Sequence, residues 1–376
     1  MKFIVNLSLC FLFCLPCFSQ AGVDSITNRL QQAYKESNLP GFAVAIVTGD
    51  TVEYKGAFGF ADIEKVTSFT PETVLNIGSV SKTFIGMALL KAVEQGKLSL
   101  DADINDYLPF KVIHPHFPGM PIRVRHLATH TSGITDRKAA YEKVYLKGPQ
   151  DSTTLEHFLK AYFIKGGRYY SDKNFSKYQP GGSFQYSNIG AALAALVIEG
   201  ATKTSFGAYT QQHIFLPLQF QTTSWFLKDI VSDSHASLYT AKNKLVPLYS
   251  LATYPDGGLR STLLDLVKYM QEAIRGYTGK GTLLTPAVYK QLFSKQFTDA
   301  ATPLNVDPKE PNTGIFWMYR KNGEIGHTGS DPGVTVIFFF NPETARGKIL
   351  ITNTELDQSS KASAFSKIWA LLGSLE

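Results

Sequence analysis

The strongest constraint on the fold is a pair of hydrophobic hairpins near opposite ends of the chain. In each, two apolar runs flank a short turn, at residues 49–50 and 341–344. Runs of this length that surround turn residues predict β-hairpins. Because an isolated hairpin is marginally stable, we expect both chain ends to share one antiparallel sheet. The strands are predicted at residues 42–47, 51–58, 334–340 and 348–354.

Helical patterns accompany these hairpins. Ile26, Leu30 and Tyr34 recur four residues apart, and residues 365–372 repeat apolar positions at the same spacing. The segment between the hairpins is rich in turns and helical patterns. We therefore predict an α/β (α+β) fold, an antiparallel sheet flanked by helices with a mostly helical inserted subdomain. Its parts are a sheet subdomain at 22–110 and 241–376 and a mostly helical subdomain at 111–240.

The N-terminus resembles a signal peptide, predicted at residues 1–20. Lys2 precedes the almost wholly apolar segment 3–18, and small residues follow at Ser19 and Ala21. Two alternatives stay open. One is a membrane anchor, although the run is shorter than the roughly 20 residues of a spanning helix; the other is a lipoprotein acylated on Cys17. We expect a periplasmic or secreted protein with no integral membrane span after cleavage.

All three cysteines lie inside this leader, so the remaining chain is expected to form no disulfide and no thiolate metal site. Hydrophobic residues make up 44% of the sequence, which indicates a globular protein. The net charge of +6 is spread over 376 residues without a basic run. We therefore expect no nucleic-acid partner.

Ser79 and Lys82 form the only S-x-x-K pattern in the chain. The residues at 84–90 are nearly all apolar, which predicts a buried helix beginning near Ser79. Residues three apart share a helix face, so Lys82 can reach the Ser79 hydroxyl. Serine needs an adjacent base to act as a nucleophile, and a lysine with a lowered pKa can be that base. Alone, the pattern is also compatible with an ordinary helix start.

Two further motifs occur later in the chain. Tyr186-Ser187-Asn188 precedes a helical run, where it is either an N-cap or a tyrosine and an amide aimed at the serine. His327-Thr328-Gly329 is the only [KH]-T-G sequence and leads into the strand at 334. It is either a turn before a hairpin or a strand edge that lies against a substrate.

Together, the three motifs follow the order S-x-x-K, S-D-N, K-T-G of penicillin-binding proteins and β-lactamases. With Tyr-Ser-Asn as the second motif, the chain resembles class C β-lactamases and their D-alanyl-D-alanine carboxypeptidase and esterase relatives. The segments 125–133 and 256–262 also look like this family, and the resemblance covers about residues 25–375.

The resemblance implies a role for each motif residue. Ser79 would be the nucleophile, Lys82 its base partner and Tyr186 a proton relay. Asn188 would hold the substrate amide, and the backbone N–H groups of Ser79 and Ser330 would form an oxyanion hole. His327, Thr328 and Gly329 would line the site.

The expected function is a serine hydrolase that acts on an amide or ester through an acyl-serine, without a cofactor. Its substrate would be a small molecule or a peptidoglycan-stem-like peptide. Class C-like β-lactamase activity is an alternative, although family β-lactamases usually carry lysine at the position of His327. With its ordinary pKa of about 6.5, His327 would lose its charge as pH rises from 6 to 8, weakening the binding of carboxylate substrates.

Other functions are less well supported by the sequence. His126 and His130 are four residues apart, but no glutamate follows His126 and no metal site is predicted. The sequence contains neither the G-x-S-x-G elbow of α/β-hydrolases nor a phosphate-binding P-loop. A penicillin-binding sensor that acylates without turnover is a different class of function. It would be expected to keep a membrane span and a signalling domain.

Overall fold

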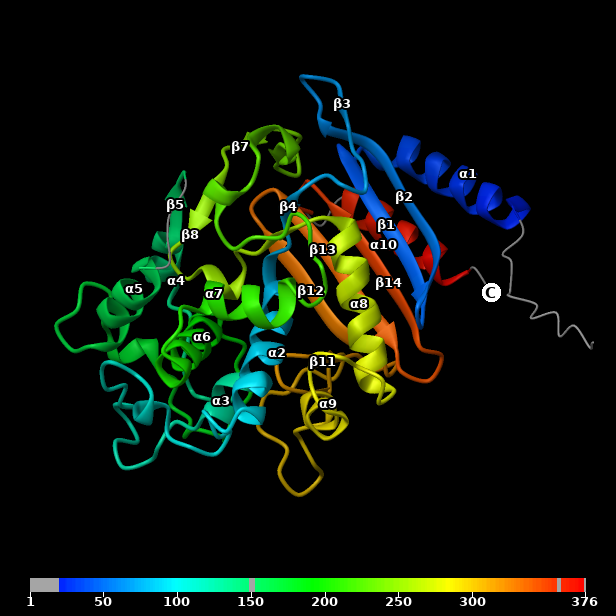
Figure 1. Ribbon diagram of the computed structural model, residues 1–376. Coiled ribbons are helices and arrows are strands. Elements are labelled where there is room, and N and C mark those ends of the chain that lie inside the picture. Colours follow the sequence, from blue (N-terminus) through cyan, green and yellow to red (C-terminus); the bar gives the residue numbers. More distant parts are fainter. Residues whose placement is uncertain (1–19, 149–152, 357–359, 375–376) are drawn as a thin grey trace, which may run out of the picture.

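The computed structural model describes residues 20–148, 153–356 and 360–374, so residues 1–19 of the predicted signal peptide lie outside it. Within this part of the chain, β1 near the N-terminus pairs with β14 near the C-terminus, as the two hairpins predict (Figure 1). Eight antiparallel strands form the sheet in the order β10 (Asn312–Thr313), β11 (Met318–Tyr319), β12 (Ile325–Asp331), β13 (Val334–Asn341), β14 (Arg346–Thr352), β1 (Gly41–Thr48), β2 (Thr51–Asp62) and β3 (Thr67–Ser68).

Two terminal helices cover one face of this sheet. α1 (Gln20–Ser37) and α10 (Ser360–Gly373) contact each other (Figure 1). Beneath them lie Phe42, Val44 and Ile46 of β1, which belong to the same buried cluster. Successive strand residues point to opposite faces. The alternation of β1 therefore supplies one apolar row to the terminal helices and a second row to the main core.

The other face is covered by α8 (Leu263–Tyr277) and α2 (Ser81–Glu94), and α2 runs through the middle of the molecule (Figure 1). Every residue of α2 from its start to Leu90 is buried, as its uniformly apolar sequence predicts. α8 is amphipathic and begins at a cap: the Thr262 hydroxyl accepts a hydrogen bond from the backbone N–H of Asp265 at 3.1 Å.

Beyond α2 lie the helices of the chain's middle, separated by long loops (Figure 1). They are α3 (Val124–Ala128), α4 (Lys138–Tyr141), α5 (Thr153–Phe163), α6 (Asn188–Thr202) and α7 (Phe206–Thr210). The structure thus has the predicted α+β architecture. β5 (Tyr145–Lys147) pairs with β8 (Tyr249–Leu251) across the predicted subdomain boundary at residue 240. The division into subdomains stays a prediction.

Shorter elements complete the described chain. The remaining strands are β4 (Leu75–Asn76), β6 (Leu238–Tyr239), β7 (Leu245–Val246) and β9 (Arg260–Ser261), and the remaining α-helix is α9 (Pro286–Phe293). Short turns of helix are η1 (Gly78–Val80), η2 (Ile104–Asp106), η3 (Glu142–Val144), η4 (Asp172–Asn174), η5 (Gln211–Phe215), η6 (Leu227–Asp229), η7 (Ser232–Ser234) and η8 (Tyr254–Asp256).

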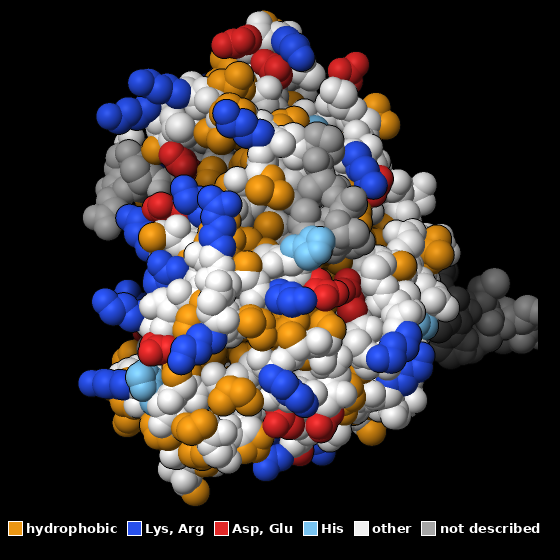
Figure 2. All heavy atoms as spheres, turned by 90° about the vertical axis from the view of Figure 1, so that its left-hand side faces the viewer, with side chains coloured by type: hydrophobic (Ala, Val, Ile, Leu, Met, Phe, Trp, Pro, Cys, Tyr) orange, Lys and Arg blue, Asp and Glu red, His pale blue; other side chains and the backbone are white. Residues whose placement is uncertain are grey.

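The surface and the helix lengths add two observations. On the face shown in Figure 2, basic and acidic side chains intermingle, with hydrophobic side chains between them. Among the described residues, no single helix is long and apolar enough to cross a membrane. The buried helix α6 and the segment Phe206–Phe215 reach that length and apolarity only as a pair bent by 80°.

Candidate active site

Ser79 stands in η1, directly before the buried helix α2. The Nζ atom of Lys82 lies 3.0 Å from the Ser79 Oγ atom. The i, i+3 spacing read from the sequence thus brings both side chains together at the start of the helix. Lys82 is fully buried, so its amine is held in place by the protein rather than by solvent.

Lys82 has two further partners that fix the direction of its amine. Its Nζ atom lies 2.7 Å from Asn188 Oδ1 and 2.6 Å from the backbone oxygen of Asp256. Both are carbonyl oxygens, which can only accept hydrogen bonds. The remaining tetrahedral position of the nitrogen therefore faces Ser79 Oγ. In a neutral amine this position is a lone pair that can accept the serine proton, and in an ammonium it is an N–H that stabilises an alkoxide.

Tyr186 forms the third side of the cluster around Ser79. The Nζ atom of Lys82 lies 5.0 Å from the centroid of its ring, and the ring of His130 stacks on it at 4.4 Å. Burial raises the pKa of the Tyr186 hydroxyl, while the Lys82 charge and hydrogen bonds with Lys82 and Ser79 oppose this rise. The phenol is thus protonated at neutral pH and is positioned to pass a proton to or from Ser79.

The segment that carries Tyr186 is held by a residue that sequence analysis missed. Asp136 accepts hydrogen bonds from the Ser187 hydroxyl at 2.8 Å and from the backbone N–H groups of Asn188 and Ile189 at 2.7 and 3.0 Å. Ser187 is the N-cap of α6, and its Oγ accepts the N–H of Gly190 at 2.9 Å. The capping alternative and the catalytic alternative are therefore compatible.

The third motif lies along the edge of β12 that faces η1. β11 pairs only with Ile325 and Gly326, so the rest of this edge has no strand partner within the described chain. The two segments approach so closely that a Cβ on Gly78 would lie 2.8 Å from the backbone N of Ser330. The backbone N–H groups of Ser79 and Ser330 are therefore near neighbours, as an oxyanion hole requires.

His327 lies beneath this edge and is 2% exposed. Its Nδ1 atom lies 2.6 Å from the backbone oxygen of Thr328 and must donate, since a carbonyl only accepts. Burial and the Lys82 charge lower the pKa of His327 to about 3. The imidazole is therefore neutral throughout pH 6–8, and the predicted loss of its charge in this range does not occur. The ordinary pKa expected from the sequence does not apply to His327, because the burial of this side chain cannot be read from the motif.

His126 and His130 do not share a helix face. α3 ends at Ala128, and His130 adopts a left-handed backbone with φ of 55°. Their Nδ1 atoms accept backbone N–H groups, from Arg123 at 3.1 Å and from Ser187 at 3.2 Å respectively. In the described part of the chain, no group of three or more His, Cys, Asp or Glu side chains is arranged to hold a metal ion.

Ser79 opens into a pocket of about 290 Å³. Of the residues singled out in the sequence, Ser79, Tyr186, Asn188 and Ser330 line it. The wall also contains residues to which sequence analysis gave no role: Tyr141, Tyr145, Asp256, Gly257 and Asp331. One signal was available, because Asp256 begins the family-like segment 256–262 and Asp331 directly follows Ser330.

Comparisons with known proteins agree with this geometry. The Beta-lactamase family matches residues 26–372. The chain is 23% identical over 339 residues to Protein flp of Staphylococcus aureus (strain MW2), covering 89% of this chain and 63% of that protein. It is 27% identical over 322 residues to the Homo sapiens protein "Serine beta-lactamase-like protein LACTB, mitochondrial", covering 70% of this chain and 58% of that protein. The chain thus spans about three fifths of the length of these curated relatives.

Among solved structures, the octameric penicillin-binding protein homologue from Pyrococcus abyssi has the same fold. Its TM-score is 0.71 at 24% sequence identity, over 93% of this chain and 77% of that chain. The family match extends over nearly all of the described residues and includes every motif of the cluster around Ser79. The chain therefore belongs to the beta-lactamase family and is a serine hydrolase-like member of it.

Proposed function

We propose that this chain is an exported serine hydrolase that cleaves an amide or ester through an acyl intermediate on Ser79. The observation that carries the proposal is the direction of the Lys82 amine, which two carbonyl acceptors aim at the Ser79 hydroxyl. Export to the periplasm or outside the cell is proposed from the leader-like sequence at residues 1–20 alone.

In the first step, Ser79 Oγ attacks the carbonyl carbon of the substrate while its proton passes to Lys82. The backbone N–H groups of Ser79 and Ser330 stabilise the oxyanion. Tyr186 donates its hydroxyl proton to the leaving amine or alcohol as the carbonyl–heteroatom bond breaks, and Lys82 returns a proton to Tyr186. The result is an ester between the acyl group and Ser79.

In the second step, water enters in the place of the leaving group. It loses a proton toward Tyr186 and Lys82 as its oxygen attacks the acyl carbon, and the same proton returns to Ser79 Oγ when the ester breaks. Asn188 presents its amide nitrogen to the substrate, because its oxygen already accepts a hydrogen bond from Lys82.

β-Lactam hydrolysis is the alternative within the family, and it has less support. Family β-lactamases usually carry a lysine where this chain has His327, and the buried imidazole is neutral. The fixed positive charge for a β-lactam carboxylate is therefore absent from this position. A sensor that acylates without turnover would use the same cluster and would differ in deacylation.

The test is a substrate panel with the purified protein and with Ser79→Ala. Nitrocefin, a short-chain nitrophenyl ester and a D-Ala-D-Ala peptide are compared, and intact mass is recorded after treatment with a fluorophosphonate. We expect one adduct on Ser79 and repeated turnover of at least one substrate. A burst of one equivalent without further product would indicate the sensor. An adduct elsewhere, or an active Ser79→Ala protein, would refute the proposal.

A further inference from the structure

One wall of the Ser79 pocket is acidic and aromatic. Tyr141 and Tyr145 lie edge to face with ring centroids 6.3 Å apart. The Tyr141 hydroxyl donates to Asp256 Oδ1 at 3.3 Å, and the Tyr145 hydroxyl donates to Asp331 Oδ1 at 2.7 Å. All four side chains line the same small pocket as the nucleophile. The pocket therefore combines two carboxyl groups with two aromatic rings beside the reacting serine.

Asp256 leaves part of its hydrogen-bonding capacity unused. The residue is 1% exposed, and its Oδ2 atom has no hydrogen-bond partner of ordinary length among the described residues, although the neighbouring Thr253 hydroxyl interacts with this carboxyl and holds its pKa down. Asp331 directs its Oδ2 atom toward the backbone of Gly257, where a Cβ would lie 3.0 Å from it. A buried polar atom without a partner is unusual and costs free energy. A polar atom of this kind in a pocket wall is expected where a bound ligand supplies the missing hydrogen bond.

In the part of the chain that the structure describes, the cationic side chains near the pocket do not form ion pairs with the carboxyl groups of Asp256 and Asp331. Lys82 donates to the backbone oxygen of Asp256 and not to its carboxylate. Arg260 donates to the backbone oxygens of Gly258 and Tyr249. Within the described chain, no Lys, Arg or His forms an ion pair with Asp256 or Asp331. None of these residue types is found in the pocket lining.

We propose that this wall recognises a positively charged amino group on the substrate, so that the hydrolase acts on small amides or esters that carry an ammonium. The inference rests on the proposed acyl-serine chemistry and names its substrate class. An ammonium offers hydrogen-bond donors to Asp256 Oδ2 and to the Asp331 carboxylate, and a cation to the rings of Tyr141 and Tyr145. A substrate carboxylate would instead meet the like charge of an ionised Asp331. At about 290 Å³, the pocket suits a small group.

The competing explanation is that the two aspartates only adjust the charge state of Lys82. The two explanations differ in one measurable way. If the carboxylates act through Lys82, their loss changes the turnover of every substrate by the same factor. If they bind an ammonium, their loss lowers kcat/KM for ammonium substrates more than for neutral ones. The ratio between two such substrates therefore separates recognition from a general effect on the catalytic group.

The test uses methyl esters and 4-nitroanilides of β-alanine, each as the free amine, the N-acetyl form and the N-succinyl form. In the wild-type protein we expect kcat/KM to be at least about tenfold higher for the free amine than for the N-acetyl form, and lowest for the anionic N-succinyl form. Asp331→Asn and Asp256→Asn should each reduce the ratio of amine to N-acetyl activity. Glu64→Gln removes one negative charge from the exposed turn after β2 and should leave that ratio unchanged.

A second readout does not depend on turnover. Benzylammonium should slow fluorophosphonate labelling of Ser79 in the wild type more than benzyl alcohol or benzoate does, and Asp331→Asn should remove this difference. The inference is overturned if Ser79 is labelled normally but neither the amine preference nor the benzylammonium protection is found. It is also overturned if the aspartate variants change kcat/KM by the same factor for all substrates. If Ser79 is not labelled at all, the proposed function itself fails.

Discussion

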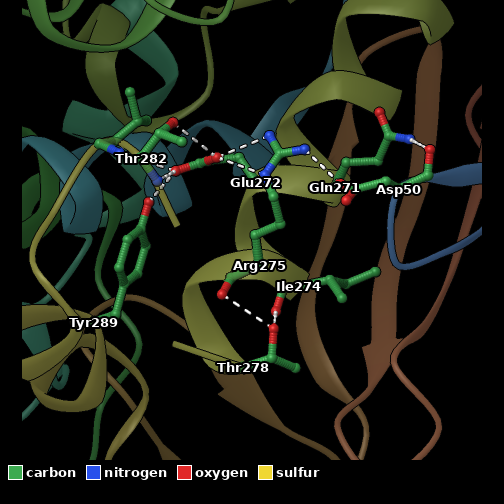
Figure 3. A network of polar contacts seen from close by, with 9 residues as sticks. Asp50, Gln271, Glu272, Ile274, Arg275, Thr278, Thr282 and Tyr289 are labelled. Carbon is green, nitrogen blue, oxygen red and sulfur yellow. Dashed lines mark hydrogen bonds and ion pairs between the residues drawn. The ribbon is translucent and has the colours of Figure 1, made fainter. Parts of the chain in front are cut away.

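Glu272 and Asp256 are both buried carboxylates, 0% and 1% exposed, yet their surroundings differ. Figure 3 shows the side chain of Glu272 enclosed by donors from the segment that follows α8. Its Oε1 atom accepts the backbone N–H groups of Thr282 at 2.6 Å and Leu283 at 2.9 Å, and also the Tyr289 hydroxyl. Asp256 has one long hydrogen bond, from the Tyr141 hydroxyl, and a weaker interaction with the Thr253 hydroxyl, and its Oδ2 atom has no partner of ordinary length within the described chain.

The two carboxyl groups also differ in their cationic partners and in the direction of their pKa shifts. Arg275 donates to Glu272 Oε2 at 2.8 Å and to Asp50 Oδ1 at 2.7 Å, which ties α8 to the turn after β1. Burial raises the pKa of Glu272, but these hydrogen bonds outweigh it and the pKa is lowered overall. Burial raises the pKa of Asp256 to about 8. The Glu272 network is complete without a ligand, and the Ser79 pocket is not.

The largest expected effect is the loss of turnover in Ser79→Ala, without a matching loss of stability. Ser79→Ala should lower turnover by on the order of 10³-fold or more, because the nucleophile of a cooperating group is lost. Its melting temperature should stay close to that of the wild type, because only one hydroxyl is removed. Steady-state kinetics and thermal unfolding of the same preparations check both statements. A large fall in melting temperature would show that Ser79 also supports the fold.

The next largest effect is a loss of stability when the hydrogen-bond network around Glu272 is broken. Glu272→Ala leaves the Tyr289 hydroxyl and the backbone N–H groups of Thr282 and Leu283 without an acceptor, and it removes the charge beside Arg275. A buried donor left without an acceptor typically costs about 1–3 kcal/mol, so losing several such hydrogen bonds should lower the unfolding free energy by about 3 kcal/mol. Urea unfolding measures this loss. Activity per folded molecule should be preserved, since the network lies outside the Ser79 pocket; a fall in kcat of the folded protein would contradict the comparison.

Removing the carboxylate of Asp256 is expected to raise the unfolding free energy near pH 8, whereas removing that of Glu272 lowers it. The folded-state pKa of about 8 lies above the ordinary aspartate pKa of 3.8. Between these values the folded protein holds a proton that the unfolded chain has lost, so the unfolding free energy falls as pH rises from about 4 to 8. Asp256→Asn should remove this slope and raise stability near pH 8 by at least about 1 kcal/mol. Unfolding at pH 5 and pH 8 in both proteins checks it.

Glu272 provides the matched control for this measurement. Its pKa is lowered below the ordinary glutamate value of 4.5, so its contribution to stability is present above that pH and is lost as pH falls further. Stability of Glu272→Ala relative to the wild type should therefore be nearly constant from pH 6 to 8. An Asp256→Asn protein that is less stable than the wild type at pH 8 would show that the carboxylate is satisfied within the fold.

The contrast also explains how much the sequence could predict. The hairpins, the terminal helices and the buried helix after Ser79 follow from hydrophobic period and turn residues, which are local signals. Ser79 in η1 and Lys82 in the first turn of α2 are three residues apart on consecutive helical turns, so their contact follows from local helix geometry. The family resemblance supplied Tyr186 and Asn188, whose approach to Lys82 depends on tertiary packing.

The acidic wall could not be predicted in this way. Tyr145 belongs to β5, Asp256 to η8 and Asp331 to the end of β12, and only the folded loops bring them together. No period or spacing relates three such segments. The charge of His327 was equally out of reach, because it depends on burial and on the nearby ammonium of Lys82. Sequence motifs predict the reacting groups, and the fold determines the charges around them.

The smallest effect tests which group gives the site its pH dependence. Burial raises the pKa of Asp331 to about 6, while the Tyr145 hydroxyl, Lys82 and Arg260 hold it down. His327, with a pKa of about 3, stays neutral from pH 5 to 8. For a β-alanine ester, kcat/KM should therefore rise between pH 5 and 7 as Asp331 loses its proton and becomes a full partner for the ammonium.

The rise should be a few-fold to about tenfold, since a single charge partner is gained and tenfold corresponds to about 1.4 kcal/mol. His327→Gln keeps a neutral side chain, so the midpoint of the rise should stay in place. Asp331→Asn should flatten the profile, and the N-acetyl ester should show a smaller rise in the wild type. Asp256, which loses its proton nearer pH 8, would add a second and separate rise. If His327→Gln moved the midpoint and Asp331→Asn did not, the imidazole would be the titrating group. The difference between the Glu272 network and the Ser79 pocket would then not account for the pH dependence of activity.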